Sequence, residues 1–559
     1  MTSVTTLQSV IERMSESPAD HGIRLIDGDR SRLLTHRELW RASHSVAGRL
    51  RSLGVRRGRS VVIALPLGSD LLTAIFGTSL AGGAVVCLNP GLLAADLDAH
   101  AQFVHRVLAL TDSPVCIASQ ALSAALRSID PRPSFALWDI AADTPSPSEA
   151  GPTEHVSSDD VAVIQFTSGT QGTPKGVVLS HANILANAMG LVRRLDATID
   201  DIGVLWVPLF HDMGLNGLFI NQLLQSRLTL LSPELFLYRP ELWLQAISET
   251  RATLSTAPNF AYARCALLPD DRLAGIDLSS WRAALCGAER VRADSLRRFS
   301  ERFATRGFDA RAFLPVYGLA EATLCATMPE PGRPLACDRM AVSPVLGGGA
   351  TPDSEGDLEH VGVGHPLDGH ELRIVDEGER PVPPRQVGEI QLRGPSVCRG
   401  YLGDSEGTAR LLADGWLRTG DFGYVSGEHL FVIGRCGEKI VIHGANHCAD
   451  DIEQVLEELP VLRRGGTIAV AVAGQTTDEL LVGCELRAPD AIDDEAAEDI
   501  EHAIRGALGT RLRLVPRTVI LLPPRSIPKT PTGKKQRSAF RDAYLAGRIA
   551  ALPLRGASR

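Results

Sequence analysis

The clearest chemical signal in the chain is a loop rich in glycine and hydroxyl side chains, residues 167–176 (TSGTQGTPKG), which follows a strand-like apolar run. Glycines let backbone N–H groups converge on one point, hydroxyls add donors, and Lys175 adds a positive charge. The loop therefore has the parts of a phosphate-binding site. Its order differs from the Walker pattern, because Pro174 precedes Lys175 and Gly176 follows it. Composition alone is equally compatible with a flexible surface loop.

The longer string FTSGTQGTPKGVVLSHANI, residues 166–184, resembles the phosphate-binding signature of the adenylate-forming superfamily. That superfamily includes acyl-CoA synthetases, luciferases and the adenylation domains of peptide synthetases. Further strings that resemble its signatures follow in the family order and cover most of the chain. The resemblance implies that ATP phosphates are bound by Thr167, Ser168, Gly169, Thr170, Gly172 and Lys175, and that Thr167 also contacts Mg²⁺.

Two later strings are similar to those of one branch, the fatty acyl-AMP ligases. In VPLFHDMGL, residues 207–215, the resemblance places His211 near the reacting carboxylate, although an isolated His–Asp pair is more often structural than catalytic. The string APNFAY, residues 257–262, would line the acyl pocket, or it could be a simple strand-to-helix turn. The implied pocket residues are Met213, Gly214, Asn259 and Phe260.

Two further strings resemble the walls of the adenine site, CGAERV at 286–291 and VYGLAEATL at 316–324. Tyr317 would stack on the purine, since an aromatic ring offers a large apolar face. Gly287 and Gly318 would let the backbone approach the flat base. Glu321 would hold Mg²⁺, which prefers a carboxylate together with phosphate oxygens. The implied nucleotide-binding residues are Gly287, Ala288, Glu289, Tyr317, Gly318, Leu319 and Ala320.

The string GWLRTGD, residues 415–421, resembles the ribose-binding signature. Asp421 would accept both ribose hydroxyls through its two oxygens, and Arg435 would help to hold the ribose and the adenylate. Near the C-terminus, PKTPTGKKQR at 528–537 is similar to the family's lysine motif. The resemblance assigns the catalytic role to Lys534, whereas Lys535 and Arg537 are expected on a solvated face.

The implied reaction is attack of a carboxylate on the α-phosphorus of ATP, with release of pyrophosphate. Two anions must meet, so Mg²⁺ on Glu321, the loop N–H groups and Lys534 would offset their charge. Because Lys534 lies far along the chain from the loop, two domains must close together. The family's pivot position is Gly437 here, which predicts a looser hinge. Cys448 and Ala449 also depart from the Tyr-Pro usual in relatives.

The elements that must position these residues follow an alternating order of helix and strand. A capping box at Thr35 and Glu38 opens a helix, residues 60–65 (SVVIAL) and 84–88 (AVVCL) read as strands, and Asp70 could cap the helix between them. This order predicts an α/β fold, with a large N-terminal domain of mostly parallel sheets flanked by helices. Beyond a composition break near Gly434 we expect a small α+β domain, joined by a hinge. The expected domains are residues 1–434 and 435–559.

Length, charge and composition limit the classes of function that the chain can have. The 559 residues exceed one ordinary core, and a formal net charge of -9 with 5% aromatic residues argues against a nucleic-acid binder. The ten scattered cysteines contain no C-x-x-C pair, so neither a zinc site nor a thioredoxin motif is indicated, and buried reduced thiols are expected. Neither a signal peptide nor an apolar run long enough to span a bilayer is evident, so the cytoplasm is the default location.

Segment 336–362 resembles the insertion that marks the fatty acyl-AMP ligases, although an ordinary long loop is the alternative. The resemblance implies a fatty acyl-AMP ligase that uses ATP and Mg²⁺ and loads the phosphopantetheine arm of an acyl carrier protein. The first alternative is an acyl-CoA synthetase, and an alternative of another class is a non-catalytic adenylate-binding scaffold. The sequence does not reveal the acid: Asn216 either makes the acyl pocket more polar or faces away from it.

Overall fold

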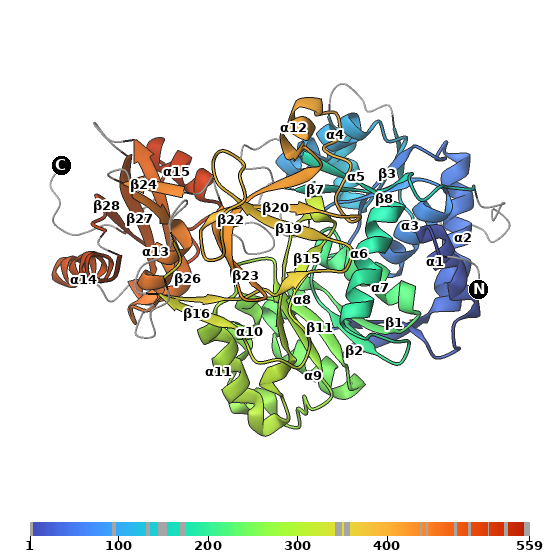
Figure 1. Ribbon diagram of the computed structural model, residues 1–559. Coiled ribbons are helices and arrows are strands. Elements are labelled where there is room, and N and C mark those ends of the chain that lie inside the picture. The colour runs from blue at the N-terminus through green and yellow to red at the C-terminus, as the bar shows by residue number, and fades with distance from the viewer. Residues whose placement is uncertain are drawn as a thin grey trace.

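The elements of the protein build a large body and a small body, which lie side by side in the computed structural model (Figure 1). The N-terminus lies in the large body, and the last strands and helices form the small one. The structure describes residues 4–91, 97–129, 135–142, 154–167, 175–340, 349–351, 358–435, 439–442, 445–473, 478–489, 493–512, 514–529, 535–549 and 551–552.

The first sheet of the large body ends at the predicted phosphate loop. Its six strands have the order β6-β5-β3-β4-β7-β8, and all neighbours are parallel except β7 and β8, which flank the loop. The central strands are apolar and fully buried, as expected for parallel strands covered on both faces. The strands are β3 (Ser60–Ala64), β4 (Ala84–Cys87), β5 (Val115–Ala118), β6 (Ala136–Trp138), β7 (Val161–Thr167) and β8 (Lys175–Ser180).

A second, seven-stranded sheet has the order β13-β12-β11-β9-β10-β1-β2, and only its edge strand β2 runs antiparallel to its neighbour. The carboxyl ends of β11 and β12 lead into the predicted acyl and adenine strings. The strands are β1 (Gly22–Asp27), β2 (Arg30–Thr35), β9 (Ile202–Leu205), β10 (Arg227–Leu231), β11 (Leu254–Pro258), β12 (Ala283–Gly287) and β13 (Phe313–Pro315).

Helices flank these sheets, and their sequences explain where they begin. Helix α2 starts after Thr35, whose hydroxyl accepts from the backbone N–H of Glu38 while the Glu38 carboxylate accepts from that of Thr35, so the predicted capping box is confirmed. The prediction for Asp70 is wrong: helix α3 is capped at Gly68 and Asp70 lies inside its first turn, where an acidic residue suits the helix dipole. The helices of this body are α1 (Leu7–Glu12), α2 (His36–Ser52), α3 (Ser69–Leu80), α4 (Leu97–Thr111), α5 (Gln120–Arg127), α6 (His181–Arg194), α7 (Asp212–Leu224), α8 (Pro233–Tyr238), α9 (Glu241–Thr250), α10 (Asn259–Cys265), α11 (Ala293–Phe303) and α12 (Ser405–Leu411).

Smaller antiparallel sheets complete the large body and carry the ribose motif. The five-stranded one has β22 at its centre, paired with both β20 and β23. Strand β23 ends at Arg435, at the expected domain boundary, and the division of the chain at that point stays a prediction. The strands are β14 (Tyr317–Gly318), β15 (Cys325–Met328), β16 (Cys337–Met340), β17 (Leu358–Val361), β18 (His365–Pro366), β19 (Glu371–Val375), β20 (Gly388–Arg393), β21 (Leu412–Ala413), β22 (Trp416–Ser426) and β23 (His429–Arg435).

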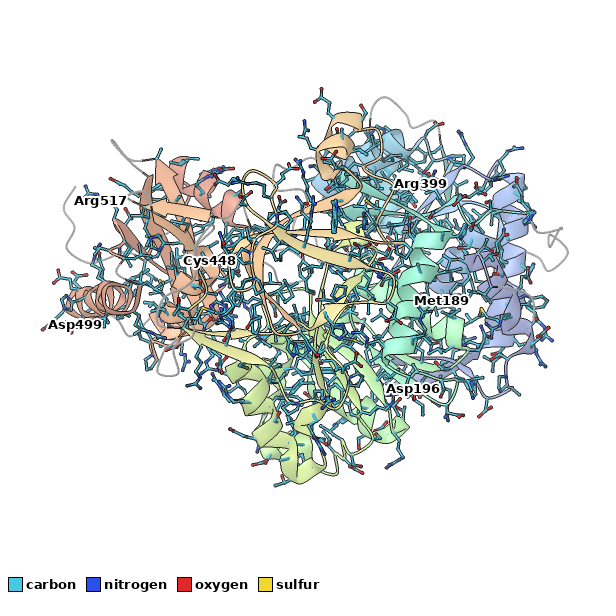
Figure 2. The ribbon with its side chains drawn as sticks, in the orientation of Figure 1. Met189, Asp196, Arg399, Cys448, Asp499 and Arg517 are labelled. Atoms are coloured by element: carbon cyan, nitrogen blue, oxygen red, sulfur yellow. The ribbon has the colours of Figure 1, made fainter. Side chains whose placement is uncertain are left out.

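The small body is α+β, which confirms the predicted fold class. Strand β27 pairs antiparallel with β26 and parallel with β28. Figure 2 shows Cys448 on the side of this body that faces the large one, and Asp499 and Arg517 on the far side. Its elements are β24 (Lys439–Ile442), β25 (Ala445–Cys448), α13 (Ala449–Glu457), β26 (Leu462–Ala473), β27 (Asp478–Leu486), α14 (Asp494–Leu512), β28 (Thr518–Leu522) and α15 (Arg537–Leu545).

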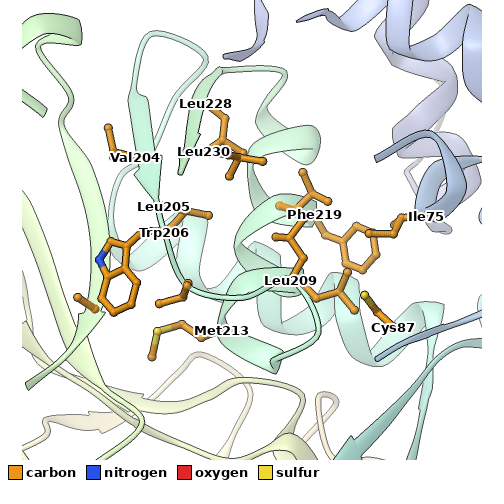
Figure 3. Close-up of a cluster of buried hydrophobic side chains, with 14 of the residues drawn as sticks. Ile75, Cys87, Val204, Leu205, Trp206, Leu209, Met213, Phe219, Leu228 and Leu230 are labelled. Atoms are coloured by element: carbon orange, nitrogen blue, oxygen red, sulfur yellow. The ribbon is translucent and has the colours of Figure 1, made fainter. Parts of the chain in front are cut away.

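Buried aromatic and aliphatic side chains form a hydrophobic cluster that includes residues of the predicted acyl-pocket strings. Trp206 stacks on Phe236 with ring centroids 3.8 Å apart, and Phe260 meets both rings edge-on. Figure 3 shows Trp206, Leu209 and Met213 in one buried cluster with side chains of α3 and α7. Eight of the nine described cysteines are buried as expected, and the exception is Cys337, which is exposed.

Candidate active site

The two ends of the predicted phosphate loop lie opposite each other. Thr167 ends β7, Lys175 begins β8, and the two residues are paired in the antiparallel register. The structure thus places both ends of the predicted loop at one edge of the first sheet. The other predicted phosphate ligands, Ser168, Gly169, Thr170 and Gly172, lie outside the described residues, and their roles stay predictions.

A distant segment covers the same edge and brings Tyr401 to the site. Backbone bonds join Val178 N–H to the Gly400 carbonyl (3.0 Å) and Leu402 N–H to the Gly176 carbonyl (2.8 Å). Tyr401 lies between these bonds, and the Lys175 ammonium sits 4.8 Å from the centre of its ring. Its hydroxyl donates to Oε1 of Glu321 at 2.7 Å. Burial, and then the negative charge of Glu321, raise the pKa of the Tyr401 hydroxyl. The sequence analysis missed Tyr401.

Glu321 fits the single carboxylate that a Mg²⁺–nucleotide site requires. It lies in a 3₁₀ turn, Ala320–Ala322, and among the described residues the side chain that contacts its carboxylate is Tyr401. No group of three His, Cys, Asp or Glu side chains in the described part of the chain could hold a metal by itself. Magnesium that is shared between one carboxylate and phosphate oxygens needs no such group. Glu321 with Thr167 is therefore compatible with a nucleotide-dependent metal site.

The predicted ribose and adenine residues meet directly. Asp421 is buried on β22, and its Oδ2 accepts from the Tyr317 hydroxyl at 2.7 Å while its Oδ1 accepts from Nε of Arg435 at 2.8 Å. Burial, and then the negative charge of Asp421, raise the pKa of the Tyr317 phenol. Both Asp421 oxygens thus have protein partners, so ribose hydroxyls would have to share or replace them. The structure brings these three residues together, and their nucleotide-binding roles stay predictions.

The wall strings have an unusual backbone. Ala288 has φ of +64° and Thr323 has φ of +71°, values that residues other than glycine seldom adopt. A Cβ on Gly318 would lie 1.7 Å from the Leu324 carbonyl oxygen, and one on Gly287 would lie 2.7 Å from the Val316 side chain. These glycines therefore permit a close approach to the protein itself, and their approach to the base stays a prediction. Backbone strain of this kind gathers at functional sites. Leu319 and Ala320, the other predicted wall residues, are buried.

The adenine wall also contacts the predicted acyl-pocket helix. Oε1 of Glu289 accepts from the backbone N–H of Phe260 at 2.6 Å, in the first turn of α10. Oδ1 of Asn259 accepts from the backbone N–H of Arg292 at 3.0 Å. The two strings therefore form one continuous surface. The bond to Arg292 also explains why the polar side chain of Asn259 can be buried, because its amide oxygen has a hydrogen-bond partner there.

The His211 motif caps helix α7. Nδ1 of His211 lies 3.3 Å from the Met213 N–H and 2.5 Å from Oδ1 of Asp212, which fixes the imidazole in a structural pair and leaves the predicted catalytic role untested. Gly214 packs so tightly that a Cβ would lie 2.1 Å from the Pro208 carbonyl oxygen. Gln165, which the sequence analysis also missed, donates from its amide to the Phe210 carbonyl at 2.9 Å and ties this loop to β7.

The structure settles the orientation of Asn216. Its buried amide donates to the carbonyl of Asp212 at 3.0 Å and to that of Thr323 at 3.2 Å. It therefore faces the adenine wall, and its amide group is bonded to backbone. The polar side chain thus braces the strained Thr323 turn against α7.

The lysine motif is described only in part. Lys534 lies outside the described residues, so its catalytic role stays a prediction. The expectation that Lys535 and Arg537 face solvent is wrong. Their side chains are 14% and 12% exposed and pair with Glu453 of α13. The negative charge of Glu453 offsets the cost of removing both positive charges from water, so both side chains can be buried.

Segment 336–362 is more than a loop at its described ends. Strands β16 and β17 pair antiparallel there. Asp338 accepts from Arg385 and from the Tyr424 hydroxyl, each at 2.9 Å, in the large body. Leu358 is buried in the hydrophobic core of the small body. The segment thus contacts both bodies.

Comparison with known proteins identifies the family of this chain, and the result agrees with the geometry of the site. The sequence profile described as "AMP-binding enzyme" matches residues 12–402, well over half of the chain. The chain belongs to the AMP-binding enzyme family. It is an ATP-dependent adenylate-forming ligase, as the resemblance implied, which disfavours the scaffold alternative.

Relatives of this ligase cover nearly all of it. The long-chain-fatty-acid–AMP ligase FadD26 of Mycobacterium marinum is 33% identical over 95% of this chain and 96% of its own. The medium-chain-fatty-acid–[acyl-carrier-protein] ligase JamA of Moorena producens is 32% identical over 92% and 90%. A structure from a study of fatty acyl-adenylate ligases of E. coli and L. pneumophila superposes with a TM-score of 0.89 at 29% identity, over 97% and 98% of the two chains.

Two further features of this ligase are the character of its helices and a groove on its surface. No described helix combines the length and apolar character that a bilayer span requires. A surface groove of about 480 Å³ lies between α10 and α11 and is lined in part by Leu267, Arg298 and Arg464. None of its lining residues is a predicted site residue, so the groove is not the predicted acyl pocket.

Proposed function

We propose that this adenylate-forming ligase activates a fatty acid as its acyl-adenylate and then passes the acyl group to the phosphopantetheine thiol of a carrier protein. The observation that carries the proposal is a pair of neighbouring clusters. Lys175, Tyr401 and Glu321 form the first. Tyr317, Asp421 and Arg435 form the second, and the charge of Arg435 also acts on Tyr401. Together the clusters offer positive charge and a carboxylate at one end and a ribose anchor at the other, which suits a bound ATP.

In the first half-reaction a carboxylate oxygen of the acid attacks the α-phosphorus of ATP, and the bond to pyrophosphate breaks. Lys175 and the loop N–H groups would offset phosphate charge, while Asp421 and Arg435 would hold the ribose. Glu321, oriented by Tyr401, and Thr167 would hold Mg²⁺, which when bound neutralises phosphate oxygens. Lys534 would approach from the small body, and Met213 and Phe260 would line the acyl pocket.

In the second half-reaction the carrier thiol attacks the acyl carbonyl carbon, loses its proton, and displaces AMP. The carrier is favoured over free CoA by the HDMGL and PNFAY strings, by segment 336–362, and by the similarity to JamA. The anchoring of that segment in both bodies supports a role beyond that of an ordinary loop.

The test is hydroxamate-trapped adenylation with fatty acids of graded chain length and polarity, followed by acyl transfer. We expect pyrophosphate release with one range of acids and thioester formation on a holo carrier protein. Efficient turnover of free CoA would reject the carrier and favour the acyl-CoA synthetase. Failure of pyrophosphate exchange with every acid would reject the substrate class.

A further inference from the structure

Buried ion pairs connect the adenine wall to helix α13 of the small body. Arg290, the residue after Glu289, pairs with Asp451 and donates to Nδ1 of His360 at 2.9 Å. Arg292 donates to Oε2 of Glu457 at 2.8 Å. The side chains of Asp451 and Glu457 are only 2% and 10% exposed. These pairs are therefore shielded from salt, unlike pairs on an open surface.

The carboxylate of Glu457 also holds the tail of the chain. Its Oε1 lies 3.0 Å from Nζ of Lys535, which is in turn 2.7 Å from Oε2 of Glu453. Arg292 of the large body and Lys535 of the small body thus share the two oxygens of one carboxylate. Lys535 directly follows Lys534 in the chain. The ion pairs that hold Lys535 therefore also limit the positions that the predicted catalytic lysine can reach.

The charges of this network support one another. Burial by itself would raise the pKa of Glu457, but Lys535 and Arg292 outweigh it and hold the pKa at about 2. Burial would lower the pKa of Lys535, but Glu453 and Glu457 outweigh it and raise that pKa. The groups therefore stay ionised at neutral pH. Removal of one partner would leave a charge buried without its counter-ion, which is strongly destabilising for the contact.

We propose that Arg290 and Arg292 of the large body, with Asp451 and Glu457 of α13, form an interdomain clasp that holds the small body in the adenylate-forming arrangement. Arg292 and Glu457 act as positioning residues: they place Lys534 through its neighbour Lys535. The inference rests on the proposed function, because it assigns the clasp to the first half-reaction. Lys534 is assigned to the charge that builds up when the acid attacks the α-phosphorus, and the thiol attacks a carbonyl carbon, so transfer to the carrier should not depend on the clasp.

The first experiment separates the two half-reactions in Arg292→Gln. We expect the adenylation kcat to fall about tenfold with little change in KM for ATP, while transfer from supplied acyl-adenylate to a holo carrier stays unchanged. Arg292→Lys keeps the charge and should recover part of the rate. The matched control is Arg298→Gln, since Arg298 lies in the same region but pairs with Asp294 of its own helix. Equal losses in both half-reactions, or equal losses in the control, would overturn the proposal.

A double-mutant cycle tests the pair itself. If Arg292 and Glu457 act through each other, Arg292→Gln combined with Glu457→Gln should slow adenylation no more than the worse single change. Losses that multiply would contradict the coupling.

Small-angle scattering tests the clasp without any assay of activity. Arg290→Gln combined with Arg292→Gln should raise the radius of gyration, and an unchanged value would overturn the clasp. Should the unaltered protein form no acyl-adenylate, the proposed function would fail, and with it the assignment to adenylation, even if the scattering confirmed the clasp.

Discussion

The contact between Tyr401 and Glu321 gives the sharpest prediction about the site. Tyr401→Phe keeps the ring beside Lys175 and removes only the hydroxyl that donates to Glu321 at 2.7 Å. A hydrogen bond to a charged group contributes about 1.5–3 kcal/mol. Tyr401 is half-buried, so water can partly replace the hydroxyl and the lower figure applies. At about 1.4 kcal/mol for each factor of ten, we expect the adenylation kcat to fall about tenfold.

The assay is hydroxamate-trapped adenylation over a range of Mg²⁺ concentrations. A less well-oriented carboxylate should raise the Mg²⁺ concentration needed for half-maximal rate. Tyr401→Leu should be slower still, because it also removes the ring from Lys175, a contact of about 0.5–1 kcal/mol. The matched control is Tyr424→Phe, which removes a similar bond to Asp338 away from these residues. The reasoning fails if Tyr401→Phe loses less than twofold, or if the control loses as much.

Three further predictions concern the tail, the braced turn and the effect of acid. Lys534→Ala should abolish adenylation and leave ATP binding largely intact by calorimetry; equal adenylation rates in variant and parent would contradict its role. Asn216→Ala removes the donor to the carbonyls of Asp212 and Thr323, the second of them buried, so urea unfolding should show a loss of about 1–3 kcal/mol, and no loss would contradict the brace. Burial, aided by Arg290, lowers the pKa of His360 from about 6.5 to about 4. Below pH 6.5 the unfolded chain therefore binds a proton that the folded chain does not, and stability should fall by about 3 kcal/mol as pH drops from about 6.5 to 4. His360→Gln should lessen that fall in pH-dependent unfolding, and an unchanged profile would refute the assignment.

The sequence was informative wherever one short segment carries both the signal and the structure. The capping box at Thr35 and Glu38, the strands around residues 60–65 and 84–88, and the strand before the phosphate loop depend on local propensity and pattern. The resemblance assigned Tyr317, Asp421 and Arg435 to one bound nucleotide, which is long-range information that a single chain lacks; the structure shows the three in contact, and their binding roles stay predictions.

Pairings between distant segments could not be read from the chain. Tyr401 reaches the site because its segment bonds to β8, and no periodicity around it predicts that partner. Lys535 and Arg537 look like ordinary surface cations until α13 supplies Glu453 and Glu457. The wrong assignment of Asp70 has a local cause: the cap position is a glycine, so the first acidic side chain stands two residues later, inside the first turn of the helix.

The burial of Leu358 in the small body's core bears on how the chain can be cut. A fragment that begins at the expected boundary near Gly434 would lack this leucine, which belongs to an earlier stretch of the polypeptide. The resulting void would destabilise the fragment by about 2–5 kcal/mol, a large share of the stability of so small a fold. Researchers who express the C-terminal piece alone should therefore find it loosely packed, and a synthetic peptide that contains β17 should restore its order.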